Sequence, residues 1–103
     1  MDELAVIWTK TALVQRNSIF NYWNTRNKSK KYSRKLNLAI KERLDILKIQ
    51  PKIGKETLIE NVRTISLRHY SIFYQIDNLS IYIVSFWDNR QDPKRLLATL
   101  RKK

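Results

Sequence analysis

One apolar stripe in the middle of the chain constrains the fold more than any other feature of the sequence. Its members recur at steps of four, four, four and three residues, which is the spacing of an amphipathic helix: Tyr32, Leu36, Ile40, Leu44 and Leu47. This helix must end near Gln50, because Pro51 disfavours helical geometry in the residue before it and Gly54 is the only glycine. The chain is therefore divided near residue 50 into a first part with helical spacing and a second part without it.

The segment before this helix predicts a short strand and a further helix. Leu4 to Trp8 is apolar and contains two β-branched residues, and the threonines that follow can cap a helix. From Ala12 to about Arg26 the apolar residues again recur at helical spacing. Because a short linker separates the two helices, we expect a helical hairpin.

Beyond Gly54 the pattern becomes that of strands. Residues 61–67, 70–76 and 80–87 are rich in β-branched and aromatic side chains. The last two segments flank Asp77-Asn78-Leu79, which predicts a β-hairpin because Asp and Asn tolerate the backbone of a tight turn. Pro93 then allows a terminal helix over residues 94–101.

This order of elements predicts a single α+β domain over residues 1–103. The amino-terminal strand joins a small, mainly antiparallel sheet, the helical hairpin packs on one face of that sheet, and a short carboxy-terminal helix ends the chain. Alternation along residues 70–76 places Tyr70, Ile72 and Tyr74 toward the helices and Phe73 on the opposite face. We expect an exposed Phe73, either as an ordinary surface residue or as part of a partner groove.

Charge limits the classes of partner. Lysine and arginine number 21 against nine acidic residues, which gives a formal charge of +12. Such a field attracts nucleic acid, a ribosome or an acidic protein. With no cysteine and one histidine we expect no metal site and no cofactor, and the absence of a long apolar run predicts no membrane span and a cytoplasmic location.

The most concentrated charge lies at the start of the second helix. Five cations and no anion occur within eight residues: Lys28, Lys30, Lys31, Arg34 and Lys35. One interpretation is a solvated helix start. The other is a docking surface, which is favoured by the fact that cations at this position oppose the helix dipole.

Several segments together resemble the RelE/ParE superfamily of toxins from type II toxin-antitoxin modules, which includes plasmid-stabilisation proteins. They are an early Val-Ile-Trp strand, the Leu-rich helix that ends at Pro51 and Gly54, the strand Tyr70-Ser-Ile-Phe-Tyr-Gln-Ile76, and Phe86-Trp-Asp-Asn-Arg-Gln-Asp-Pro93. The resemblance implies a small basic toxin that stops growth when it is released from an acidic antitoxin. RelE-like members cut mRNA on the ribosome, whereas ParE-like members inhibit DNA gyrase without nuclease chemistry.

The residues favour the ParE-like activity. The position where RelE-like members carry a phosphate-binding arginine is Ser71, and residues 91–103 contain neither the tyrosine nor the histidine expected as an acid-base group. His69 could act as an acid or a base, yet it lies beside the expected position. Arg63, Arg68 and Arg90 are expected to cluster at sheet positions, either binding phosphate or carboxylate groups or pairing with Asp88 and Asp92.

We therefore expect a ParE-like toxin that binds a target, with gyrase as the candidate, and that is not an enzyme. The alternatives are a metal-independent, ribosome-dependent mRNA endonuclease, whose candidate catalytic residues are Arg63, Arg68, His69 and Arg90, and an inactive homologue that serves as corepressor. Residues expected to bind the target or the antitoxin are the five cations of the second helix start together with Arg68, Ser71, Phe73, Arg90, Lys94 and Arg95.

Overall fold

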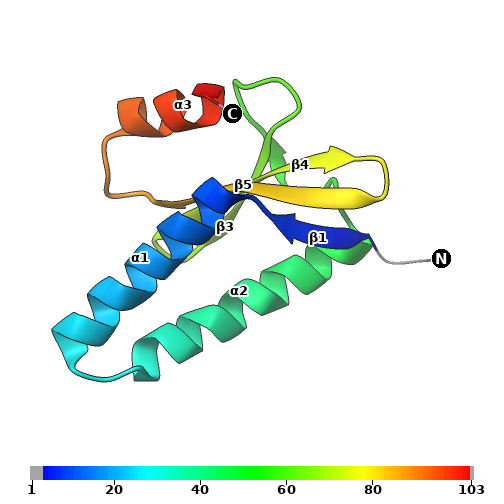
Figure 1. Ribbon diagram of the computed structural model, residues 1–103. Coiled ribbons are helices and arrows are strands. Elements are labelled where there is room, and N and C mark those ends of the chain that lie inside the picture. The colour runs from blue at the N-terminus through cyan, green and yellow to red at the C-terminus, as the bar shows by residue number, and fades with distance from the viewer. Residues whose placement is uncertain (1–3, 103) are drawn as a thin grey trace.

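A computed structural model describes residues 4–102 of the chain (Figure 1). Its elements in chain order are β1 (Ala5–Trp8), α1 (Lys10–Asn27), α2 (Lys31–Ile49), β2 (Lys55–Glu56), β3 (Arg63–Leu67), β4 (Tyr70–Asp77), β5 (Ser80–Asp88) and α3 (Pro93–Lys102). The predicted α+β class and the predicted order are confirmed. Strand β2 was missed, because two exposed charged residues give no apolar alternation to detect.

The strands form one five-stranded sheet in the order β1-β5-β4-β3-β2. Strand β1 runs parallel to β5 and every other pair is antiparallel, so the prediction of a mainly antiparallel sheet is confirmed. The turn between β4 and β5 has Asn78 at φ 59°, in the left-handed region that asparagine tolerates.

The helical hairpin covers one face of the sheet, below the strands in Figure 1. The predicted stripe of α2 faces the core, where Leu36, Ile40 and Leu47 pack with Ile72 and Tyr74 of β4. Thr9 caps α1 by accepting a hydrogen bond from the Ala12 N–H at 3.3 Å. No helix within residues 4–102 is long and apolar enough to cross a membrane.

The opposite face of the sheet carries α3 (Figure 1). Leu100 of α3 is buried in a second apolar cluster with Val62, Phe73, Val84 and Trp87. Phe73 is only 8% exposed, so the prediction of an exposed Phe73 is wrong. The error arises because α3 has an apolar side of its own, which folds back over this face.

An irregularity in β5 fixes α1 to the sheet. The register shifts between Phe73 and Tyr74, whose partners are Ser85 and Ile83, so that Val84 has no partner on β4. The side chain of Gln15 in α1 reaches this bulge, where its Oε1 accepts hydrogen bonds from the Phe86 N–H at 2.9 Å and the Ser85 hydroxyl at 3.0 Å. The bulge therefore sets the position of α1 beside the end of β5.

Candidate functional site

A tight turn and the segment after β5 meet at one end of the sheet. Arg68 and His69 form the two-residue turn between β3 and β4, and the pairing of Tyr70 with Asp88 brings them beside Asn89. The Asn89 N–H donates to the carbonyl of His69 at 2.9 Å, and the Ser71 hydroxyl donates to Asn89 Oδ1 at 2.8 Å. We call this group, together with Arg90, the turn end; its members are Arg68, His69, Ser71, Asn89 and Arg90.

The position of this turn agrees with the predicted ends of the two strands at residues 67 and 70, but no residue in it predicts the type of turn. Arg68 adopts φ 57°, a left-handed conformation for which arginine has no special preference. No glycine, asparagine or aspartate marks the position, so the usual signal of a two-residue hairpin is missing. Both Arg68 and His69 are exposed on this turn.

Arg90 is paired within the chain. Its Nε and Nη2 donate to Asp88 Oδ1 and Oδ2 at 2.9 and 2.8 Å, and its backbone N–H donates to Oδ1 at 2.9 Å. These hydrogen bonds lower the pKa of the Asp88 carboxyl and raise the pKa of the Arg90 guanidinium. Any phosphate that bound to Arg90 would have to compete with a carboxylate already in place.

Arg63 lies away from the turn end. It begins β3, whereas Arg68 follows the last residue of that strand, so about 17 Å of extended chain separates the two. The predicted cluster of Arg63, Arg68 and Arg90 is therefore wrong: only Arg68 and Arg90 share one end of the sheet. Arg63 instead donates to the carbonyl of Gly54 at 2.8 Å and contacts Glu56 at 3.5 Å.

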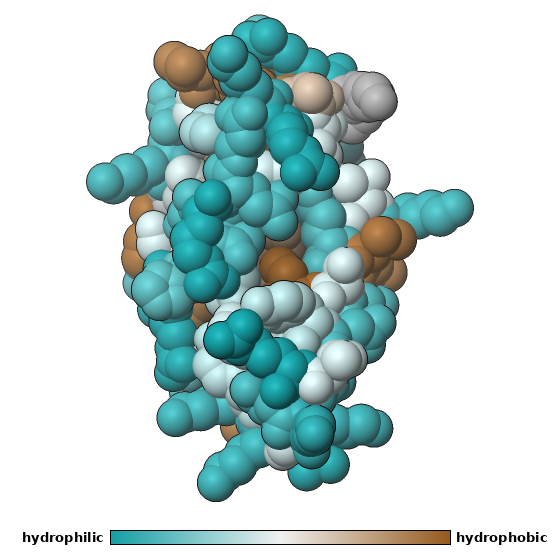
Figure 2. Space-filling model, turned by 90° about the vertical axis from the view of Figure 1, so that its left-hand side faces the viewer, coloured by the Kyte–Doolittle hydropathy of each residue, from teal (hydrophilic) through white to brown (hydrophobic). Residues whose placement is uncertain are grey.

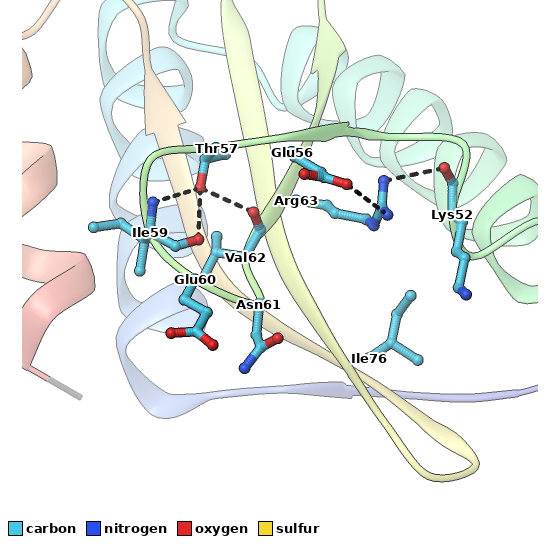
Figure 3. A pocket seen from close by; sticks show the side chains of 9 residues that line it. All are labelled: Lys52, Glu56, Thr57, Ile59, Glu60, Asn61, Val62, Arg63 and Ile76. Atoms are coloured by element: carbon cyan, nitrogen blue, oxygen red, sulfur yellow. Dashed lines mark hydrogen bonds and ion pairs between the residues drawn. The ribbon is translucent and has the colours of Figure 1, made fainter.

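A groove of about 470 Å³ lies beside Arg63 (Figure 3). It is lined by Lys52, Glu56, Thr57, Ile59, Glu60, Asn61, Val62, Arg63 and Ile76. The Thr57 hydroxyl holds the loop above it, donating to the carbonyl of Val62 at 2.9 Å and accepting from the Ile59 N–H at 3.1 Å. The Thr57 hydroxyl and the Arg63 guanidinium beside this groove are therefore both already bonded to backbone carbonyls.

An aromatic group on the helices packs beside the turn end. Trp23 Nε1 donates to the Tyr70 hydroxyl at 2.9 Å, and the Trp23 ring packs on Tyr32 with centroids 4.9 Å apart. Burial raises the pKa of the Tyr70 hydroxyl. Sequence reasoning assigned Trp23 to a helix and missed this contact, because the two residues are 47 positions apart.

A hollow of about 340 Å³ joins this aromatic group to the turn end. Tyr22 and Trp23 of α1 line it on one side, and Asp88, Arg90 and Gln91 line it on the other. Tyr22 is 54% exposed there and accepts a hydrogen bond from Arg26 at 3.3 Å. Tyr22 was not among the predicted site residues. The signal that could have identified it is its position next to Trp23 on a helix with several cations.

The predicted cations of the second helix start surround the junction of α1 and α2. We call residues 26–35 the hairpin tip; its cations are Arg26, Lys28, Lys30, Lys31, Arg34 and Lys35, and all are exposed. Figure 2 views the molecule from the side on which the tip lies, and hydrophilic side chains cover most of that side. Lys94 and Arg95 are also exposed, but they lie on α3, across the sheet from the hairpin (Figure 1).

The chemistry available at the turn end is limited. Ser71 carries no charge and its hydroxyl is bonded to Asn89, Arg90 is paired, and His69 is exposed on the turn. Within residues 4–102 no three His, Cys, Asp or Glu side chains gather closely enough to hold a metal ion. The exposed cations here and at the hairpin tip are suited to binding a polyanion or an acidic surface.

Comparisons with known proteins agree with this geometry. Residues 6–93 match a family described as the ParE toxin of the type II toxin-antitoxin system, parDE. A solved structure titled "Chromosomal ParDE TA system from P. aeruginosa" contains a chain with the same fold, at a TM-score of 0.69 and 18% identity, covering 82% of this chain and 94% of that one. No curated protein matches this chain.

Proposed function

Because this chain belongs to the ParE toxin family of type II toxin-antitoxin systems, we propose that it stops growth by binding a cellular target, DNA gyrase, without cutting RNA. A cognate antitoxin with acidic residues neutralises it. Membership of the family supports the assignment as a toxin. The identity of the target and the binding of an acidic antitoxin are what we propose.

The arrangement of the arginines carries this proposal. Metal-free RNA cleavage needs cations converging on the phosphate together with a base and an acid. Arg63 is at the far end of β3, Arg90 is paired with Asp88, and Ser71 offers no charge. The turn end is therefore better suited to binding than to phosphoryl chemistry.

One observation keeps the endonuclease as a second candidate. Arg68 and His69 are adjacent and exposed on the same turn, so a cation and an imidazole are presented together. If the chain cuts mRNA on the ribosome, these two residues are the ones to carry the chemistry.

Two assays with the purified protein separate the candidates. In a reconstituted translation reaction mapped by primer extension, we expect intact mRNA, and in a gyrase supercoiling assay we expect inhibition. Ribosome-dependent cuts that disappear in R68Q/H69Q but persist in K94Q/R95Q, which lies on α3, would overturn the proposal. Harmless overexpression without the antitoxin would instead indicate an inactive corepressor.

Antitoxin binding has a separate test. Because the partner is expected to place carboxylates against the exposed cations, the affinity should fall as salt is added. With Phe73 buried under α3, that ring is not a contact site unless α3 moves. An affinity independent of salt would contradict an electrostatic interface.

A further inference from the structure

The hairpin tip is the centre of a long segment without a single acidic residue. From Leu4 to Lys41 the sequence has no aspartate or glutamate, and it has nine cations: Lys10, Arg16, Arg26, Lys28, Lys30, Lys31, Arg34, Lys35 and Lys41. Six of these nine lie on the tip. We propose that the hairpin tip binds the phosphate backbone of duplex DNA.

The charge of the tip is not neutralised within the chain. The ion pairs among residues 4–102 involve Lys48, Arg63 and Arg90, and none of these belongs to the tip. Arg26 donates to the Tyr22 hydroxyl and lies over the Trp23 ring, and both of these partners are neutral. Clustered like charges of this kind raise the free energy of the folded state, so an external anion is the group that relieves them.

The composition of the tip favours nucleic acid over a protein partner. Protein interfaces have an apolar core, whereas DNA interfaces are more polar and much more positively charged. No large apolar side chain is exposed within residues 26–35; the nearest are Tyr22 on α1 and Leu38 on α2, one on each side of the tip. Tyr32, the one aromatic residue of the tip, is partly buried against Trp23.

The density of cations favours a duplex over a single strand. Lys30, Lys31, Arg34 and Lys35 lie within five helical steps, about 7.5 Å along the axis of α2. Duplex DNA presents about four charges over that length and a single strand about two. Single-strand binding also relies on exposed rings for base stacking. The ring of Tyr32 is already packed on Trp23, and the exposed Tyr22 lies outside the tip.

The backbone of the tip is held in place before any partner binds. Lys28 ends α1 in a left-handed conformation at φ 51°, and the Ser29 N–H donates to the carbonyl of Asn24 at 3.2 Å. The buried Ser33 hydroxyl of α2 donates to the Asn24 side chain of α1. The cations are therefore carried on a fixed backbone, and binding orders only their side chains.

The test is fluorescence anisotropy with the full chain and a labelled duplex of about 20 base pairs, measured across a salt series. The variant is K31Q/K35Q, and the matched control is K52Q/K55Q, which removes an equal number of charges at and just before β2. The slope of log K against log salt should fall by about 2 in the first variant. It should change little in the control, and neither variant should lower the thermal midpoint of the wild type.

Each other outcome overturns the proposal. An equal loss in both variants would mean that net charge alone attracts DNA. A single strand bound as tightly as the duplex would exclude duplex DNA as the preferred partner, and poly-glutamate bound as tightly would indicate acidic chains in general. The assay contains neither gyrase nor ribosomes, so its result is independent of the proposed target.

Discussion

Replacing Gln15 with leucine should loosen α1 from the sheet without changing the size of the side chain much. Gln15 Oε1 is the acceptor for two donors at the β5 bulge, the Phe86 N–H at 2.9 Å and the Ser85 hydroxyl at 3.0 Å. Ser85 is 0% exposed and Phe86 is 1% exposed, so water cannot replace the lost acceptor.

The expected loss follows from these two contacts. A buried N–H left without a partner costs about 1–3 kcal/mol, and a lost hydrogen bond costs about 1 kcal/mol. We therefore expect the free energy of unfolding of Q15L to fall by about 3 kcal/mol. For a domain of this size the thermal midpoint should fall by roughly 12–24 °C.

Urea unfolding followed by tryptophan fluorescence measures this loss. Q15E is the matched control, because a carboxylate oxygen still accepts both hydrogen bonds, and its loss should be clearly smaller. In a double-mutant cycle, S85A should cost less in the Q15L background than in the wild type. A loss below about 0.5 kcal/mol for Q15L, or simple additivity in the cycle, would refute the reasoning.

Two further predictions concern the ends of the sheet. Because Arg90 lowers the pKa of the Asp88 carboxyl, their pairing stabilises the folded state above the ordinary pKa of about 4, and this stabilisation is lost as the pH falls further. The free energy of unfolding of D88N should therefore be lower than that of the wild type at pH 7, and the difference should shrink at acid pH. A difference independent of pH would contradict this. In G54A the new methyl would overlap the Tyr74 hydroxyl and lie 2.8 Å from the Thr64 carbonyl oxygen, so urea unfolding should show a free energy of unfolding lower by about 1–3 kcal/mol. An unchanged urea midpoint would show that the loop around Gly54 can move to make room.

Local pattern was sufficient for most of the architecture. The stripe of α2, the alternation along β4 and the Asp77-Asn78 turn each depend on neighbouring residues, and all three were predicted. Strand β2 was missed because its two charged residues have no preference for a strand. The Arg68-His69 turn was located only by the ends of the strands beside it, because neither residue favours a left-handed backbone. Their geometry comes from pairing with β3 and β4.

The candidate site was less predictable, since its contacts join distant parts of the chain. Sequence position suggested one arginine cluster, but β3 separates Arg63 from Arg68. The pairing of Arg90 with Asp88, two residues away, was one of the predicted alternatives and is confirmed. The contact of Trp23 with Tyr70 had no sequence signal either, because helix and sheet meet there only after folding.

The amino-acid sequence by itself determined the order of elements, the family and the concentration of cations at the hairpin tip, because these depend on residue type and spacing. Only the tertiary structure decided which side chains are available to a partner. Packing of α3 buried Phe73, and a hydrogen bond to the Gly54 carbonyl occupied Arg63. Exposure and pairing are properties of contacts between elements, and those contacts are formed by burial of apolar faces that no single segment contains.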